Sequence, residues 1–179
     1  MTVVYFWVMD TQKTNLPDRI SIQRLNTLHP KIRKEALDLY ERASSVLTGR
    51  AQMRIVQALR TFDEQAALYA QGRTKPGKVV TNAKAGQSFH NYGLAIDFAL
   101  LIDGKAISWE TGKDFDGDHV ADWMEVVKIF KDAGWAWGGD WTGTLRDLPH
   151  LEKTFGKGWK ELLALHNEGK MDPAGYVRF

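Results

Sequence analysis

Apolar residues recur at intervals of three and four residues in five parts of the chain, and this spacing predicts helices. The first helix begins at Ser21 and ends before Pro30, because a residue that precedes proline disfavours the helical conformation. Pro30 itself suits the first turn of a second helix, which Gly49 ends. Three more helices are expected over residues 61–72, 118–134 and 158–167.

Shorter apolar runs between these helices predict strands over residues 53–60, 94–101, 105–109 and 135–141, and the Asp103-Gly104 turn joins the second strand to the third. Helices and short strands are mixed without strict alternation, which favours an α+β fold with a small antiparallel sheet and flanking helices. Residues 72–88 are rich in glycine and lysine, and a loop of this length is usually functional or mobile.

Length and composition indicate one domain over residues 1–179, since the chain contains no repeat, linker or low-complexity tract. Cysteine is absent, which excludes a disulfide framework and a thiolate nucleophile and leaves histidine and carboxylate as the ligands for any zinc ion. Residues 1–9 are apolar but lack the basic segment and cleavage site of a signal peptide. We therefore expect them to form a strand or an apolar cap on the core.

The charge pattern points to the middle of the chain. The total of 24 basic and 22 acidic residues leaves a net charge of +2, which is too small to indicate a nucleic-acid-binding protein. Residues 61–152 nevertheless hold 14 acidic and 9 basic side chains, whereas residues 1–60 hold 5 acidic and 10 basic ones. We expect the chemistry in the acidic middle segment.

Asp97 stands out in the strand over residues 94–101. Side chains of a strand alternate between its two faces, so Asp97 shares a face with Ala95 and Ala99, which leaves room above it for a metal ion. His90 precedes the same strand, and Gly93 allows the chain to turn between them. A histidine and an aspartate at one point suit zinc, although a plain hydrogen-bonded pair is the favoured explanation of these two residues taken alone.

A second histidine strengthens the metal interpretation. Pro149 keeps His150 out of a regular helix, so His150 is presented from a turn or a short strand, and Asp147 lies within one turn of it.

Two separated motifs resemble those of a known family. Residues 88–97, SFHNYGLAID, match the S-x-H-x-x-G-x-A-x-D signature of the zinc peptidases that cleave peptidoglycan stem peptides, which include D-alanyl-D-alanine carboxypeptidases and L-alanyl-D-glutamate endopeptidases. Residues 137–141, WGGDW, followed by Asp147-x-x-His150, resemble the second motif of the endopeptidase branch, which includes phage endolysins. The resemblance covers residues 22–155 and implies the fold shared by these peptidases and hedgehog-type domains. Leu151 stands where the family usually has an aromatic residue, and the chain beyond residue 155 matches no wall-binding module.

The resemblance implies a catalytic zinc site and a general base. His90, Asp97 and His150 would be the zinc ligands, with water at the open fourth position. Asp147 would act as the general base, and Glu152 is the alternative. This role suits Asp147 only if burial near other carboxylates raises its pKa.

Further residues are expected at the substrate. Arg60 would stabilise the oxyanion or hold a substrate carboxylate, or else form an ordinary salt bridge. Ser88 would orient the loop or a ligand by hydrogen bonding. Gln65 is expected to bind substrate, and Trp137 and Trp141 either stack on substrate or build the core and pocket wall. Basic side chains in the 72–88 loop either bind acidic peptidoglycan or are simply solvated; they are Arg73, Lys75, Lys78 and Lys84.

An acidic stretch raises the question of calcium. Asp114, Asp116, Asp118 and Glu125 occupy positions 1, 3, 5 and 12 of an EF-hand-like loop, but His119 replaces the glycine expected at position 6. A solvated acidic turn that caps the following helix is the competing interpretation. The remaining histidines, His29, His119 and His166, are expected to be ordinary surface or capping residues.

Together these features predict a zinc endopeptidase that cleaves the stem peptide between L-alanine and D-glutamate. A D-alanyl-D-alanine carboxypeptidase and a non-catalytic zinc-binding module are the alternatives. The resemblance implies a phage or prophage lysis enzyme, monomeric and cytoplasmic until a holin-type partner opens the membrane. No nucleic-acid partner and no stable membrane insertion are expected.

Overall fold

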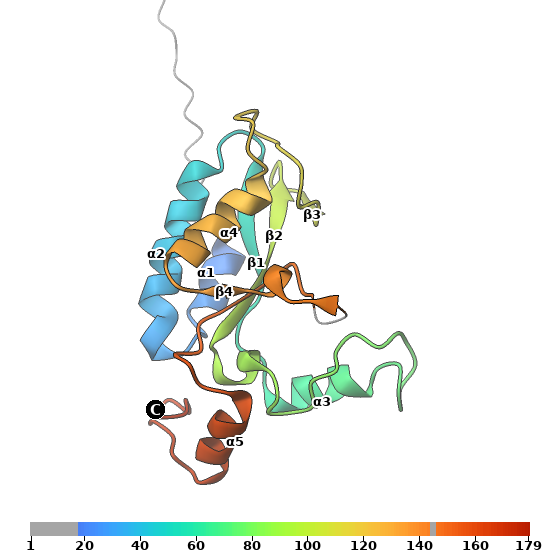
Figure 1. Cartoon of the computed structure of the whole chain (residues 1–179), viewed down its shortest axis with the longest axis vertical. Helices are drawn as coiled ribbons and strands as arrows, with labels where there is room; N and C mark the ends of the chain where they lie inside the picture. The colour runs from blue at the N-terminus through green and yellow to red at the C-terminus, as the bar shows by residue number, and fades with distance from the viewer. Residues whose placement is uncertain (1–17, 144–145) are drawn as a thin grey trace, which may run out of the picture.

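The computed structural model describes residues 18–143 and 146–179 and has an α+β fold with an antiparallel sheet (Figure 1). The apolar segment at residues 1–9 lies outside the described residues. Five α-helices are found in the described part: α1 (Arg19–Leu25), α2 (Pro30–Val46), α3 (Phe62–Ala70), α4 (Asp122–Asp132) and α5 (Trp159–Asn167). The strands are β1 (Ala51–Gln57), β2 (Ala95–Ile102), β3 (Ala106–Ser108), β4 (Ala136–Trp137) and β5 (His150–Glu152), with 3-10 turns η1 (Phe89–Tyr92) and η2 (Gly138–Asp140).

Strand β2 organises the sheet. One of its edges pairs with β1, while β5 and β3 share the other edge, with β5 beside Ala95–Asp97 and β3 beside Leu100–Ile102. Strand β4 then pairs with β5 at the sheet margin. The β2–β5 register places Asp97 opposite His150, so two residues 53 positions apart in the sequence become neighbours.

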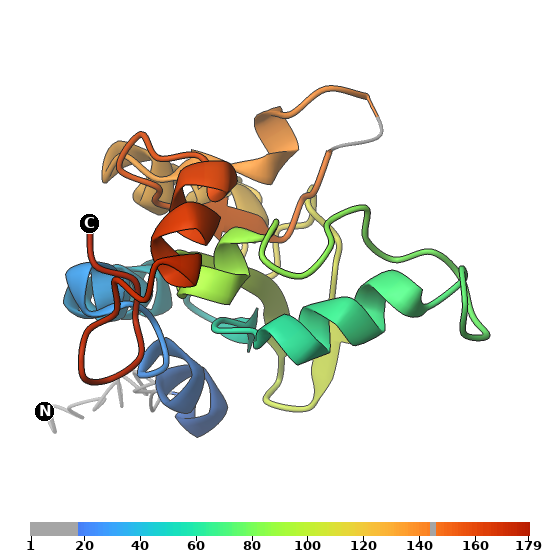
Figure 2. The same ribbon diagram turned by 90° about the horizontal axis from the view of Figure 1, so that it is seen from below.

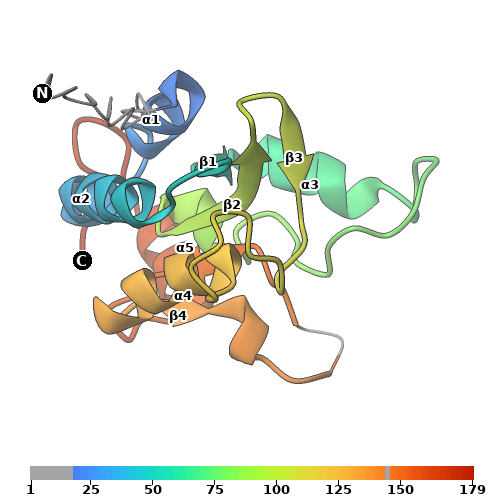
Figure 3. The ribbon, with the colours of Figure 1, turned by 90° about the horizontal axis from the view of Figure 1, so that it is seen from above.

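The helices bury one continuous apolar cluster against the sheet. Helices α1 and α2 pack on β1, and α4 packs on α2 (Figure 3). Helix α5 lies at the lower end of the molecule (Figure 1). Leu162 of α5 and Val177 near the C-terminus belong to the same cluster as Leu39 and Phe98. The segment after residue 155 therefore packs on the core that carries the two motifs.

Local signals explain where several helices begin. Pro30 occupies the first turn of α2, where its missing N–H costs nothing, and the His29 ring accepts a hydrogen bond from the backbone N–H of Lys31. Thr61 and Glu64 form a reciprocal capping box at the start of α3. The expected helix over residues 118–134 begins later than predicted, at Asp122, because the residues before it fold into a loop.

Two expected strands need correction. The strand expected over residues 135–141 covers only Ala136–Trp137, and the chain continues as the 3-10 turn η2. The partner strand expected over residues 105–109 is shorter and covers Ala106–Ser108.

Residues 72–88 form the long connection that was expected. This segment runs from the end of α3 to η1 without a regular helix or strand of its own, and Figure 2 shows it with α3 at one side of the molecule. None of the helices within residues 18–143 and 146–179 is long and apolar enough to cross a membrane.

Candidate metal centre

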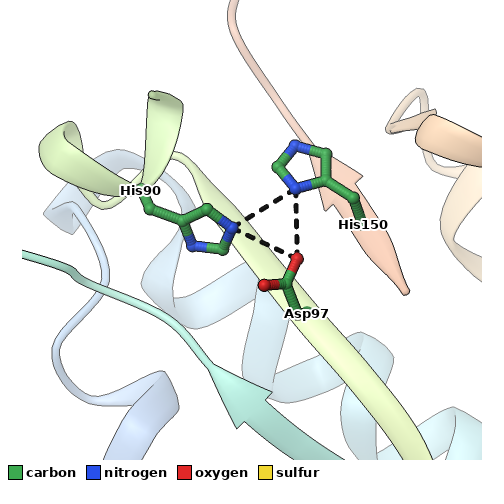
Figure 4. A group of neighbouring side chains, drawn as sticks. All are labelled: His90, Asp97 and His150. Atoms are coloured by element: carbon green, nitrogen blue, oxygen red, sulfur yellow. Dashed lines mark hydrogen bonds and ion pairs between the residues drawn. The ribbon is translucent and has the colours of Figure 1, made fainter. Parts of the chain in front are cut away.

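Three side chains from three separate elements converge on one point. His90 comes from η1, Asp97 from β2 and His150 from β5 (Figure 4). Their ligand atoms form a small triangle: His90 Nε2 lies 3.2 Å from Asp97 Oδ1, His150 Nδ1 lies 3.1 Å from the same oxygen, and the two nitrogens are 3.3 Å apart. The structure thus brings together all three residues that the sequence predicted as zinc ligands.

Two glycines make this convergence possible. Gly93 adopts a left-handed conformation (φ 65°) between His90 and β2, and a Cβ atom there would lie 2.7 Å from the backbone nitrogen of His29. At Gly138, a Cβ atom would lie 2.4 Å from the carbonyl oxygen of Asp147 and 3.1 Å from the Cβ atom of His150. The chain that carries the second histidine can therefore approach η2 only because position 138 has no side chain.

Each imidazole is held by a partner on its other nitrogen. His90 Nδ1 lies 2.7 Å from the carbonyl oxygen of Ala58, and His150 Nε2 lies 2.9 Å from Glu152 Oε2. A carbonyl oxygen only accepts hydrogen bonds, so the Nδ1–H of His90 donates to Ala58 and leaves Nε2 as a lone-pair donor. Glu152 selects the corresponding state for His150, with a proton on Nε2 and a lone pair on Nδ1. The two inner nitrogens face Asp97 Oδ1; each can offer its lone pair to a metal ion or, when it is protonated, donate a hydrogen bond to the carboxylate.

The charges at this point depend strongly on one another. Burial alone would raise the pKa of Asp97, but the two imidazoles outweigh burial and hold this pKa well below its ordinary value. Burial alone would lower the pKa of His150, but its hydrogen bonds to Asp97 and Glu152 raise it to about 9. Without a metal ion, the group therefore retains a proton at neutral pH.

The donor set fits zinc. Zinc takes histidine nitrogen and carboxylate oxygen at about 2.0–2.1 Å in tetrahedral geometry, for which the ligand atoms are about 3.3 Å apart. The observed separations of 3.1–3.3 Å match this spacing before any ion is added. Three protein ligands leave a fourth position for water, which is the arrangement of catalytic rather than structural zinc sites.

Asp147 and Arg60 lie beside the triad. Burial raises the pKa of Asp147, the nearby Asp97 raises it further, and the surrounding cations only partly oppose this. The condition set by the sequence for a general base, a raised pKa, is therefore met. Arg60 Nη2 lies 3.7 Å from Asp97 Oδ2, and Arg60 Nη1 donates to Gln65 Oε1 at 2.9 Å.

A cavity of about 720 Å³ opens above the triad. Asp147, Arg60, Ser88 and Trp141 line it, as do Thr81 and Asn82 of the 72–88 connection. The ring of Trp141 lies 5.2 Å from that of His150, so this aromatic side chain forms the cavity wall next to the metal ligands. Ser88 precedes η1 and makes no side-chain capping hydrogen bond.

Two expected substrate residues lie behind the wall instead. Gln65 is completely buried and donates from Nε2 to the carbonyl oxygen of Ala83, so it positions Arg60 and the connection rather than facing the cavity. Trp137 is 7% exposed and donates from Nε1 to the carbonyl oxygen of Leu148. Of the two alternatives for Trp137, the structure agrees with a place in the core. Its ring packs in the apolar cluster, and its indole N–H has a buried acceptor.

Two residues at the site have roles that the motifs did not reveal. Arg146 lines the cavity next to Asp147, and its Nε donates to the carbonyl oxygen of Gly139 at 3.2 Å. Asn91 joins three loops, because it donates to the carbonyl oxygens of Arg60 and Thr61 and accepts from the N–H of Gly86. Asn91 is part of the quoted motif, but only the fold shows which backbone groups it satisfies.

The other histidines lie away from the triad. His29 caps α2 and lies 2.9 Å from the carbonyl oxygen of Val177 through Nε2, and His166 stacks on Phe62. His119 lies in the connection between β3 and α4. The expectation that His29 is a capping residue is confirmed, although its side chain is buried rather than on the surface.

The fold and the site together define a metallopeptidase-like protein, and comparison with known proteins agrees. A family model described as D-alanyl-D-alanine carboxypeptidase matches residues 81–153, which include the whole triad. The chain is 46% identical over 125 residues to the peptidoglycan L-alanyl-D-glutamate endopeptidase CwlK of Bacillus subtilis, and the match covers 70% of this chain and 72% of that protein.

Two further relatives are more distant. The chain is 31% identical over 112 residues to the L-alanyl-D-glutamate peptidase of Listeria phage A118, a match that covers 58% of this chain and 34% of the phage protein. The crystal structure of the L-Ala D-Glu endopeptidase ChiX of Serratia marcescens superposes with a TM-score of 0.50 at 23% identity, over 76% of this chain and 88% of that chain. This last likeness supports the fold alone.

The chain therefore belongs to the peptidase family of the D-alanyl-D-alanine carboxypeptidases and L-alanyl-D-glutamate endopeptidases. It is a metallopeptidase of this family, and His90, Asp97 and His150 are its candidate metal ligands.

The raised pKa of His150 predicts a pH-dependent metal affinity. Below a pKa of about 9 the metal-free site holds a proton that zinc must displace, so the zinc association constant should rise about tenfold per pH unit between pH 6 and 8. Competition with a chromophoric chelator, corrected for the chelator's own protonation, measures this constant. An association constant that stays flat over this range would contradict the prediction.

The contact between Glu152 and His150 predicts a positioning role for this carboxylate. Glu152→Ala should weaken zinc binding about 10–100-fold, because nothing then fixes the ring and its protonated nitrogen. Glu152→Gln should lose less, since its amide oxygen still accepts the Nε2–H. Glu161→Ala, which removes an exposed carboxylate on α5, serves as the control in the same competition titration. Wild-type affinity in Glu152→Ala would show that Glu152 does not orient His150.

Proposed function

We propose that this protein is a zinc-dependent endopeptidase that hydrolyses the amide bond between L-alanine and D-glutamate in the peptidoglycan stem peptide. The observation that carries the proposal is the preformed triangle of two imidazoles and one carboxylate below a cavity that also contains a carboxylate with a raised pKa. The choice of bond is supported by the relatives from Bacillus subtilis and Listeria phage A118, whose names state this specificity.

Different residues of the chain would bind the metal ion and transfer the proton during amide hydrolysis. When bound by His90, Asp97 and His150, a zinc ion supplies Lewis acidity and activates water for attack on the amide carbonyl. Asp147 accepts the proton of the attacking water and then delivers it to the departing amine nitrogen. Its raised pKa makes the carboxyl group a better match for proton transfer near neutral pH than an ordinary aspartate.

Arg60 and Arg146 give the cavity its cationic side. Both line the cavity, whereas Asp97, Asp147 and Glu152 supply negative charge around the metal ligands. A guanidinium group binds a carboxylate or a developing oxyanion through several N–H donors. D-glutamate in the stem peptide carries a free carboxylate, so these arginines suit a substrate with an acidic residue at the cleaved bond.

The setting of this activity stays a prediction. The relatives include a bacterial enzyme and a phage enzyme, and the identity to the bacterial one is higher. Cytoplasmic storage, release through a holin-type partner and a monomeric state would accompany a role in phage lysis. That role would be supported if cells expressing the protein stay intact at first and lyse only after their inner membrane is permeabilised.

The proposed division of work predicts that Asp147 is needed for hydrolysis but not for metal binding. Asp147→Ala should retain bound zinc and lower kcat by about 10²–10⁴-fold, because the proton acceptor is lost while the three ligands stay. Asp140→Ala removes an exposed carboxylate from the same segment and should have kcat near that of the wild type. Turnover by Asp147→Ala equal to that of the wild type would remove Asp147 from the mechanism and favour Glu152.

Digestion of purified peptidoglycan tests the proposed bond and the metal requirement together. Mass spectrometry should detect stem-peptide fragments with a new amino terminus on D-glutamate, a chelator should abolish their release, and added zinc should restore it. Release of free D-alanine would instead identify a D-alanyl-D-alanine carboxypeptidase. A zinc-loaded protein that binds peptidoglycan without releasing any fragment would be a binding module.

A further inference from the structure

Five carboxylates gather where the connection from β3 enters the first turn of α4, at the opposite end of β2 from the zinc ligands. We call them the acidic loop, which comprises Asp114, Asp116, Asp118, Asp122 and Glu125. Their oxygens form two overlapping groups, one from Asp114, Asp116 and Asp122 and one from Asp116, Asp118 and Glu125, and within each group the atoms lie within 4.8 Å of one another. Asp116 belongs to both groups and therefore occupies the centre of the acidic loop.

Buried oxygens without hydrogen-bond donors distinguish this loop from a solvated acidic turn. Asp122 is completely buried; its Oδ1 accepts from the N–H of Phe115 at 2.9 Å, but its Oδ2 has no hydrogen-bond partner. Glu125 Oε2 is also buried without a partner. No lysine or arginine within the described residues forms a salt bridge with any of the five carboxylates. Buried anionic oxygens in this state are costly unless a cation compensates them.

The backbone has the conformation that a calcium loop needs. In the EF-hand spacing the five carboxylates occupy positions 1, 3, 5, 9 and 12, and Asp122 is the member that the sequence pattern did not include. Position 6 is His119, whose φ of 75° is the left-handed conformation that glycine usually provides. The objection raised by the missing glycine is therefore removed, because the histidine makes the same turn.

Hydrogen bonds from the backbone already shape the acidic loop. Asp114 accepts from the N–H groups of Asp116, Gly117 and His119. Asp116 Oδ2 accepts from both the N–H and the hydroxyl of Thr48, each at 3.0 Å. These contacts join the acidic loop to the turn between α2 and β1, which lies at the same end of the molecule (Figure 1).

The electrostatic state of Glu125 agrees with a site that favours a cation. Burial raises its pKa, the four aspartates of the acidic loop act in the same direction, and together they bring it to about 7. The competing interpretation, that this stretch caps the following helix, fails in one respect, since the residue at the α4 N-cap is Ala121 and no side chain caps it.

We propose that the acidic loop is a calcium-binding site, separate from the catalytic metal, formed by Asp114, Asp116, Asp118, Asp122 and Glu125. Calcium is the cation that the chemistry favours, because all five side chains offer oxygen and calcium takes six to eight oxygen ligands in flexible geometry. Magnesium requires a stricter octahedron and gives up its water reluctantly, and zinc prefers nitrogen or sulfur among its ligands.

The position of the acidic loop indicates a structural role for the ion. It lies near the Ile102 end of β2, whereas the zinc ligands lie near the Ala95 end. Calcium bound there would connect the segment before α4 to the first turn of α4, and Asp116 would link both to the turn after α2. Neutralising the five carboxylates should therefore stabilise the fold without contacting the cavity.

Thermal unfolding of the zinc-loaded full chain in calcium-free buffer tests this proposal. Calcium added at about one hundred times its Kd should raise Tm by about 5–10 °C, and magnesium should raise it less. In Asp118→Asn and Glu125→Gln the calcium-induced shift should fall below half of the wild-type value. Without calcium, Glu125→Gln should melt above the wild type, because it removes a buried charge that has no partner.

Matched controls make the result specific. Glu110→Gln removes an exposed carboxylate outside the acidic loop and should keep the full shift, and zinc content should be equal in all variants. Terbium luminescence excited through Trp123, the residue after Asp122, needs no variant and should be quenched by excess calcium. Absence of a calcium shift, an equal shift with magnesium, or a full shift in both acidic-loop variants would overturn the proposal. None of these readouts requires hydrolysis, so they are independent of the proposed activity.

Discussion

The antiparallel pairing of β2 with β5 is the constraint on which the catalytic centre depends. Neither strand carries two metal ligands, and the register alone sets Asp97 opposite His150. Because side chains alternate along a strand, a slip of one residue would turn one of these two side chains to the opposite face of the sheet and separate them. His90 then needs only the short η1 turn and Gly93 to reach the same point. The metal site is therefore a direct consequence of strand register.

The sheet tolerates this group of buried polar residues because each has a partner. Two imidazoles and a carboxylate in the interior would be costly if their hydrogen-bonding groups were unpaired. Here Ala58 and Glu152 hold the outer nitrogens, and the inner nitrogens lie within hydrogen-bond distance of Asp97, where the proton that the metal-free group retains is shared. This arrangement keeps the ligand atoms at the spacing that zinc requires, so little rearrangement is needed when the ion binds.

Carboxylates occur in two different environments in this protein, one at the cavity and one in the acidic loop. Asp147 has a raised pKa next to a cavity and two arginines, where a proton can be accepted and passed on. Asp122 and the Oε2 atom of Glu125 are buried, no lysine or arginine in the described part of the chain forms a salt bridge with either residue, and the loop before them is already turned around Asp114. Proton transfer suits the first environment, and a bound cation suits the second.

The sequence alone was enough to predict most of the helices and the candidate metal ligands of this protein. Helical periodicity, proline and glycine signals located the helices of the described region to within a few residues, and two motifs identified the triad, the general base candidate and the family. These features are local, so they can be read from neighbouring residues. The start of α4 was predicted too early in the sequence. The Asp114 side chain accepts hydrogen bonds from the backbone N–H groups of Gly117 and His119, and these bonds compete with helix formation.

Tertiary structure decided which residues face the cavity and which support it. Gln65 and Trp137 have the types expected of substrate contacts, yet both are buried behind the wall, whereas Arg146 lines the cavity without any signal in its own sequence neighbourhood. The pairing of Glu152 with His150 and the inclusion of Asp122 in the acidic loop also became visible only in the fold. The physical reason is that the packing of the elements decides which way each side chain points and how deeply it is buried, and a local sequence pattern records neither.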